Sequence, residues 1–122
     1  MEQQKFSIRS RVNSFQYAWA GIARFIWAEH NARIHLVATV IVIIAAWVLK
    51  VTHGEAAALA LAVGLVWITE MLNTCVERTM DLISRDLHPG IMFIKDLAAG
   101  AVLVAAIAAL VTGSFIFIPK FL

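Results

Sequence analysis

The sequence predicts an all-α integral membrane protein in which three transmembrane helices follow an amphipathic helix on the membrane surface. Its 122 residues are 61% hydrophobic and only 15% charged, and their mean hydropathy is +0.83. A soluble domain of this length could not bury so much apolar surface. Three apolar segments, at about 34–52, 56–72 and 97–119, each have the roughly 20 residues that a helix needs to cross a bilayer core. We expect residues 1–122 to form one domain.

The segment before the first span, residues 7–29, has the pattern of a helix lying on the membrane surface. Phe15, Trp19, Ile22 and Ile26 recur at spacings of four and three and form one apolar stripe, while basic and amide side chains lie off that stripe. Trp and Tyr side chains suit the headgroup level of a bilayer. The simplest interpretation of this segment alone is a membrane anchor.

The distribution of charge predicts how the three spans are oriented. Lys and Arg concentrate on the cytoplasmic side of membrane proteins, and here most of them precede the first span or lie between the second and third. The N-terminus and the 73–96 segment are therefore expected in the cytoplasm. Of the acidic residues, only Glu55 lies on the far side, although acidic residues contribute little to topology. The cytoplasmic basic residues are Lys5, Arg9, Arg11, Arg24, Arg33, Arg78, Arg85 and Lys95; Lys50 and Lys120 lie opposite.

The third span carries small residues four apart: Ala101, Ala105, Ala109 and Gly113. Such a ridge lets two helices approach closely, either inside one chain or between chains. Three helices form a thin bundle with little room to enclose a pocket. We therefore favour association between copies of the chain.

The second transmembrane helix, expected at about 56–83, carries a stripe of polar side chains at its cytoplasmic end. At about 100° per residue, its three carboxylates fall within about 40° of one another around the helix axis, and an amide and a hydroxyl flank them. The stripe covers roughly 16 Å of that axis. We call it the carboxylate face, and it consists of Glu70, Asn73, Thr74, Glu77 and Asp81.

Glu70 is the most costly member of the carboxylate face because it lies within the second apolar segment. A charge near the bilayer centre costs about 2.5–3.5 kcal/mol on insertion scales, and less toward the interface. An intramembrane carboxylate is therefore a candidate functional residue, and Glu70 is suited to be a general base. The alternative is a structural ion pair with an Arg or Lys of a neighbouring helix. Glu77 could pair in the same way with Arg78 or Arg85.

Carboxylates on a single stripe repel each other unless a cation lies between them, and Mg²⁺ takes one or two carboxylates together with substrate phosphates. The carboxylate face therefore predicts a cation site at the inner membrane boundary. Lys95, beside Asp96 at the entrance to the third span, could contact phosphate as a point charge or could simply extend toward water. Glu29 could be a metal ligand or the partner of Arg33, four residues later.

Several other kinds of site are excluded by what the sequence lacks. The single Cys75 rules out an internal disulfide and any multi-cysteine metal site. There is no G-x-x-x-x-G-K-[ST] loop for a nucleotide, and a net charge of +2 is too weak to indicate nucleic acid. The spacing of the histidines does not form a ligand cluster; they are His30, His35, His53 and His88.

The stretches EMLNTCVERTMDLI and KDLAAGAVL resemble the small prokaryotic integral-membrane lipid kinases, the diacylglycerol kinase and undecaprenol kinase family. The signature of that family is E-x-x-N-[ST]-x-x-E-x-x-x-D followed by a Lys-Asp pair about fourteen residues on, and residues 70–96 match it at every position. The resemblance covers nearly the whole chain, because it extends upstream to Tyr17, Trp19, Gly21, Glu29 and Arg33.

The resemblance implies a homotrimer in the bacterial inner membrane, with active sites shared between neighbouring copies. It implies transfer of the γ-phosphoryl group of ATP to a membrane lipid hydroxyl, with Mg²⁺ as the cofactor. Matched by position, Glu70 would be the general base, and Glu29 and Glu77 would hold the metal. Asn73 and Asp81 would support this arrangement.

The resemblance also implies which residues surround the two substrates. The lipid would contact Trp19, Arg33 and Glu70. A family arginine that binds ATP aligns with Ser10, although Arg9 and Arg11 flank it. The stretches RIHLVA and HPGIMFIKDLAAGAVL look more like the undecaprenol kinase branch, but both branches share the catalytic residues, so either lipid remains open. The nucleotide would lie among Arg11, Tyr17, Asp86, His88, Lys95 and Asp96.

Two interpretations from other classes stand beside the lipid kinase. A small oligomeric ion or proton carrier would use the carboxylate face as a relay, although this face reaches only one side of the membrane. The first and third spans carry no matching carboxylates at mid-membrane. A structural membrane subunit would pair its carboxylates with the basic residues of a partner, and it would fold stably only when that partner is present.

Overall fold

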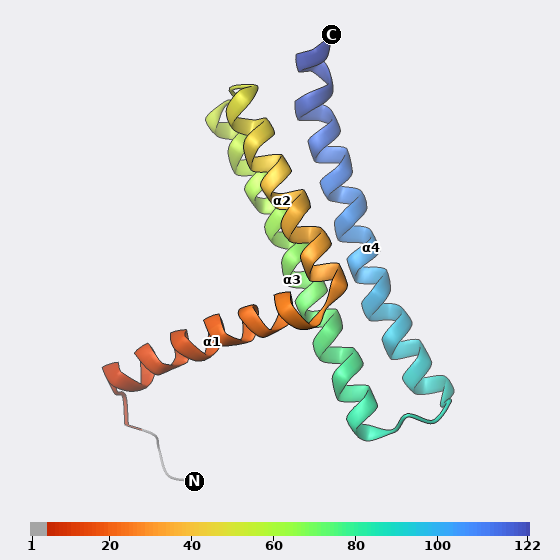
Figure 1. Cartoon of the computed structure of the whole chain (residues 1–122). Helices are drawn as coiled ribbons and strands as arrows, with labels where there is room; N and C mark the ends of the chain where they lie inside the picture. The colour runs from red at the N-terminus through yellow and green to blue at the C-terminus, as the bar shows by residue number, and fades with distance from the viewer. Residues whose placement is uncertain (1–4) are drawn as a thin grey trace.

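The computed structural model describes residues 5–122, and this part of the chain is helical without any strand (Figure 1). Its elements follow one another with short connections. They are α1 (Ile8–Ala28), α2 (His30–Val48), α3 (His53–Ile83), α4 (Pro89–Phe117) and a short 3₁₀ helix, η1 (Ile118–Phe121).

Within residues 5–122, three helical segments are long and apolar enough to cross a membrane: His30–Val48, His53–Ile83 and Pro89–Phe121. The prediction of an all-helical chain with three such segments is therefore confirmed. α4 begins well before the apolar segment that starts near residue 97, because Pro89 suits the first turn of a helix. In addition, His88 Nδ1 accepts a hydrogen bond from the backbone N–H of Gly90 at 3.0 Å.

α1 leaves the bundle of α2, α3 and α4 at a steep angle (Figure 1). The change of direction occurs at Glu29, whose backbone is extended, with φ −111° and ψ 127°. This residue ends α1 and also precedes the first residue of α2. Phe15 and Trp19 on α1 are 71% and 70% exposed, so this part of the expected apolar stripe is not covered by the rest of the chain.

The bundle is held together mainly by α3 and α4, which pack along much of their length, whereas α2 touches α3 more sparingly. Ala105 on α4 is only 2% exposed. Ala109 and Gly113, from the same small-residue ridge, are half-buried. The ridge thus contributes to packing inside the chain, at least at Ala105, and is not kept wholly for contacts between copies.

The end of the bundle opposite α1 is fixed by a helix cap and an ion pair. The Thr52 hydroxyl accepts from the Glu55 N–H at 3.1 Å, and the Glu55 carboxylate accepts from the Thr52 N–H at 2.9 Å. Glu55 also pairs with Lys120 at 3.2 Å. The start of α3 and the end of the chain therefore meet at the same end, as the charge distribution predicts.

Candidate active site

Among residues 5–122, Glu70 on α3 is the only charged residue that is buried, and it is 6% exposed. Its Oε1 lies 2.9 Å from Nε2 of His35 on α2. The ion pair considered from the sequence, with an Arg or Lys, is therefore replaced by a pair with histidine. Sequence reasoning missed His35 because it looked for histidines spaced as a cluster, whereas this one is matched to a carboxylate on another helix.

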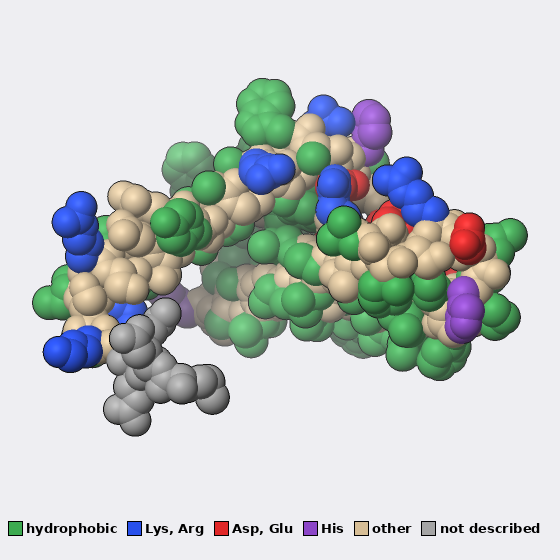
Figure 2. All heavy atoms as spheres, turned by 90° about the horizontal axis from the view of Figure 1, so that it is seen from below, with side chains coloured by type: hydrophobic (Ala, Val, Ile, Leu, Met, Phe, Trp, Pro, Cys, Tyr) green, Lys and Arg blue, Asp and Glu red, His purple; other side chains and the backbone are tan. Residues whose placement is uncertain are grey.

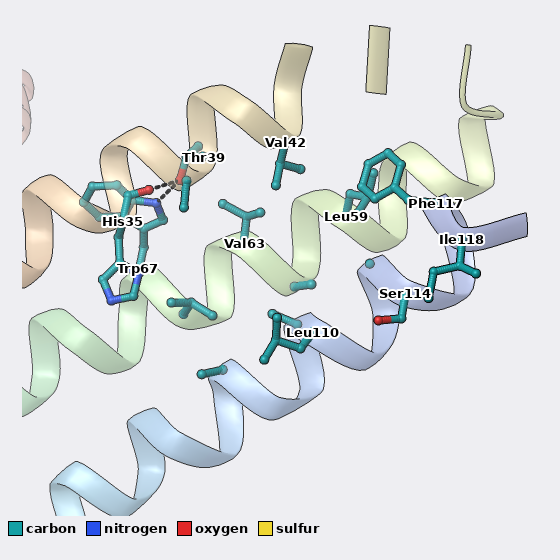
Figure 3. A pocket seen from close by; sticks show the side chains of 16 residues that line it. His35, Thr39, Val42, Leu59, Val63, Trp67, Leu110, Ser114, Phe117 and Ile118 are labelled. Carbon is teal, nitrogen blue, oxygen red and sulfur yellow. Dashed lines mark hydrogen bonds between the residues drawn. The ribbon is translucent and has the colours of Figure 1, made fainter. Parts of the chain in front are cut away.

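A second polar contact joins the same two helices beside the first. The Trp67 indole N–H donates to the Thr39 hydroxyl at 2.8 Å, and that hydroxyl donates to the His35 carbonyl at 2.6 Å (Figure 3). Thr39 follows His35 by four residues, and Trp67 precedes Glu70 by three, so each pair shares one helix face. A search for polar residues spaced in this way on the apolar spans would have found both.

An apolar groove of about 550 Å³ begins at His35 and runs between α2, α3 and α4. Figure 3 shows His35, Thr39 and Trp67 toward one end, and Phe117 and Ile118 at the other. The groove offers little polar surface along its length, so it suits an apolar occupant such as a hydrocarbon chain. Other side chains that line it are Val42, Leu59, Val63, Val66, Leu110 and Ser114.

Glu29 is bound across the bundle to Arg78 of α3, with 2.8 Å between the carboxylate oxygen and the guanidinium nitrogen. The alternative pair with Arg33 does not form. The chain breaks its helix at Glu29, so the two residues do not share a helical face. A nitrogen of the Arg33 guanidinium lies instead 3.3 Å from Nδ1 of His30.

Asn73 and Glu77 contact each other on the carboxylate face. The Asn73 amide donates to the Glu77 carboxylate at 3.4 Å, while the Asn73 Oδ1 is buried and has no partner among the described residues. Neither Arg78 nor Arg85 forms an ion pair with Glu77 in residues 5–122. This part of α3 therefore presents oxygen atoms that basic side chains do not neutralise.

The nucleotide residues suggested by the resemblance are only partly brought together. Lys95 on α4 binds Asp81 on α3 at 2.7 Å, with exposed Asp96 beside it. α1 carries Arg11 and Tyr17, and it extends away from this end of α3 and α4 (Figure 1). One chain by itself does not bring these two side chains to Lys95.

The remaining predicted residues are exposed at the surface of the molecule. His88 caps α4, and Asp86 is exposed in the connection between α3 and α4. Trp19 and Arg33 are also exposed. Seen from below in Figure 2, the acidic side chains lie among Lys and Arg side chains, and hydrophobic side chains cover the flanks.

The carboxylates do not form a complete metal centre within this part of the chain. Residues 5–122 contain no group of three His, Cys, Asp or Glu side chains placed to hold an ion. Mg²⁺ needs few protein ligands when substrate phosphates supply the others. The oxygens of Glu29, Asn73 and Glu77 are of the kind that suits such a partial site.

Comparison with known proteins points to one family. The family model described as prokaryotic diacylglycerol kinase matches residues 16–117. A diacylglycerol kinase of Synechocystis is 44% identical over 110 residues, which are 89% of this chain and 63% of that protein. The chain therefore spans less than two thirds of the length of that relative.

Two further relatives match over most of both sequences. The undecaprenol kinase of Bacillus subtilis is 34% identical over 116 residues, covering 92% of this chain and 94% of that protein. The diacylglycerol kinase of Escherichia coli is 34% identical over 97 residues, covering 79% of each. The names of these relatives specify two different lipids.

Proposed function

Because the chain belongs to the prokaryotic diacylglycerol kinase family, we propose that it is a lipid kinase that transfers the γ-phosphoryl group of ATP to a membrane lipid hydroxyl. The acceptor is diacylglycerol, which gives phosphatidic acid, or undecaprenol, which gives undecaprenyl phosphate. The observation that carries the proposal is the position of Glu70. It is buried and bound to His35, which lines the apolar groove, and it lies on the same helix as the exposed carboxylates Glu77 and Asp81.

The lipid side of the reaction is assigned to the groove and to Glu70. A hydrocarbon chain in the groove leaves its hydroxyl group near His35, whose imidazole is bound to the Glu70 carboxylate. Glu70 acts as the general base for this hydroxyl. Trp19 and Arg33, exposed near the start of the spans, contact the lipid at headgroup level, where Trp and Arg side chains are favourable.

The water side is assigned to the rest of the carboxylate face and to α4. Kinases of this family use a divalent metal with ATP, and we assign Mg²⁺ to Glu29 and Glu77. The unpartnered Oδ1 of Asn73 supports an oxygen-binding cation here. When bound, Mg²⁺ neutralises charge on the ATP phosphates. Asn73 supports the proposed metal ligand Glu77 through the hydrogen bond from its amide to the Glu77 carboxylate.

The nucleotide is assigned to residues around the connection between α3 and α4. Lys95 contacts phosphate, and Asp81 orients it through their 2.7 Å contact. Phosphoryl transfer depends mainly on positioning and charge neutralisation, so the reaction needs no P-loop. The other nucleotide contacts are Arg11, Tyr17, Asp86, His88 and Asp96.

We assign the active form to a homotrimer whose sites are shared between neighbouring copies. Two observations support sharing: α1 carries Arg11 and Tyr17 away from Lys95, and the carboxylates of residues 5–122 form no complete metal centre. Exposed apolar residues along the spans, such as Ile107 at 52% and Leu110 at 71%, provide surface for neighbouring copies or for lipid.

We place the protein in the bacterial inner membrane, with the N-terminus and the active site on the cytoplasmic side. The excess of Lys and Arg at that end supports this orientation. α1 lies along the membrane surface, because its steep departure from the bundle turns it away from the direction of the spans (Figure 1). Its exposed Phe15 and Trp19 then face the bilayer.

The test is phosphoryl transfer by the purified protein in detergent. Labelled Mg²⁺-ATP is supplied with diacylglycerol or with undecaprenol, and Glu70→Gln is the control. We expect the parent protein to transfer label to one of the two lipids and Glu70→Gln to transfer none. The lipid that becomes labelled is then identified as the acceptor. A folded oligomer that labels neither lipid would overturn the proposal and would favour an ion carrier or a structural subunit.

A further inference from the structure

We propose that His35 is a positioning residue for Glu70. It donates a hydrogen bond from Nε2 to Oε1 of the carboxylate, and it thereby leaves Oε2 free to receive the proton of the lipid hydroxyl. This inference rests on the proposed function, because it requires Glu70 to act as the base. The two atoms lie 2.9 Å apart, and the side chains of His35 and Glu70 are 24% and 8% exposed.

The bond matters because Glu70 has little other stabilisation in residues 5–122. His35 is the only hydrogen-bond partner of its carboxylate there. An ionised carboxylate that is buried without a donor is costly, and a carboxyl group that already carries a proton cannot act as a base. The imidazole N–H of His35 supplies the donor that this carboxylate otherwise lacks in residues 5–122, and hydrogen bonds to charged groups are strong.

The surroundings of His35 hold its ring in the orientation that this role requires. Its backbone carbonyl accepts from Thr39, and Thr39 in turn accepts from the Trp67 indole. The imidazole lies edge-to-face against Trp67, with 6.5 Å between ring centroids. Donation from Nε2 requires a ring that carries a proton on that nitrogen. α2 and α3 are thus linked at two adjacent levels, and only the first level involves Glu70.

Phosphoryl transfer to the lipid exchanges one phosphorus–oxygen bond for another. The lipid hydroxyl oxygen forms a bond to the γ-phosphorus of ATP, and the bond from that phosphorus to the β–γ bridging oxygen breaks. The electron pair of the broken bond stays with ADP. The hydroxyl proton moves to Oε2 of Glu70, while Oε1 keeps the bond from His35.

The test compares the turnover of full-length variants in detergent, with diacylglycerol and undecaprenol each supplied as acceptor. His35→Leu removes the donor, His35→Gln keeps an N–H at the position of Nε2, and His35→Asn keeps polarity but is too short to reach Glu70. Thr39→Val is the matched comparison, because it breaks the second link between α2 and α3 but keeps the His35 donor to Glu70.

We expect His35→Leu and His35→Asn to lower kcat by about 10- to 100-fold, as for loss of a hydrogen bond to a charged group, with an unchanged KM for ATP. His35→Gln should stay within about threefold of the parent. Thr39→Val removes a support of His35 but keeps its N–H donor, so it should lower Tm and should reduce kcat much less than His35→Leu does. If His35→Leu does not fold, the difference in kcat between His35→Gln and His35→Asn tests the inference.

Three results would overturn the inference: equal loss of kcat in the Gln and Asn variants, a loss of kcat in Thr39→Val as large as in His35→Leu, or full turnover by His35→Leu. These results are distinguishable from failure of the proposed function, which would appear as no transfer by the parent protein or as full transfer by Glu70→Gln.

Discussion

The contact between Glu29 and Arg78 allows a metal ligand to be distinguished from a structural ion pair. Their charged atoms are 2.8 Å apart, but the side chains are 30% and 66% exposed. Solvent screens such a pair, so its contribution to stability is at most about 1 kcal/mol. If Glu29 only pairs with Arg78, then Glu29→Gln and Arg78→Met should each lower stability by that small amount and should affect activity alike.

If Glu29 holds the metal, the two variants should differ. Glu29→Gln should raise the Mg²⁺ concentration needed for half-maximal activity by at least about tenfold, which corresponds to 1.4 kcal/mol. Arg78→Met leaves the carboxylate in place and removes a competing cation, so its Mg²⁺ requirement should be unchanged or lower. The assay is lipid phosphorylation at fixed total ATP with varied Mg²⁺. Equal Mg²⁺ requirements in both variants would refute the metal role of Glu29.

Two further variants test other parts of the molecule. Glu77→Gln should raise the apparent KM for Mg²⁺-ATP by about tenfold or more without changing the lipid KM, and a normal nucleotide KM would argue against its metal role. Ala105→Leu places extra atoms in the contact between α3 and α4, where Ala105 is 2% exposed. It should destabilise the protein by about 1–3 kcal/mol, seen as a lower Tm in detergent, whereas exposed Ala108→Leu should cause a smaller loss.

The helices were predictable because the apolar composition of a segment is enough to indicate that it can span a membrane. About 20 apolar residues suffice to indicate a span, and the three expected segments correspond to α2, α3 and α4. The end of the surface helix near residue 29 was expected, but the contact that accompanies the extended backbone of Glu29 was not accessible to this reasoning. The sequence around it contains no proline or glycine, and its extended backbone is accompanied by a contact to Arg78, which is distant in sequence.

The candidate site was predictable only along α3. Helical periodicity places Glu70, Glu77 and Asp81 on one stripe from spacing alone. The partners that these carboxylates take on other helices depend on how the helices pack, and spacing does not give this. His35 was therefore not predicted among the site residues, although it binds Glu70. Lys95 was assigned to phosphate, but the contact between Lys95 and Asp81 was not predicted.

The geometry of α3 limits how the two substrates can meet. Seven residues separate Glu70 from Glu77, which corresponds to about 10 Å along the helix axis. Reacting atoms must approach to about 3–3.5 Å, so a metal at Glu77 cannot lie beside the lipid hydroxyl. The proposed roles therefore require the triphosphate to extend along α3, with its γ-phosphoryl group directed toward Glu70 and its other phosphates toward Lys95. Because a rigid helix sets this separation, the lipid does not have to leave the membrane and ATP does not have to enter it.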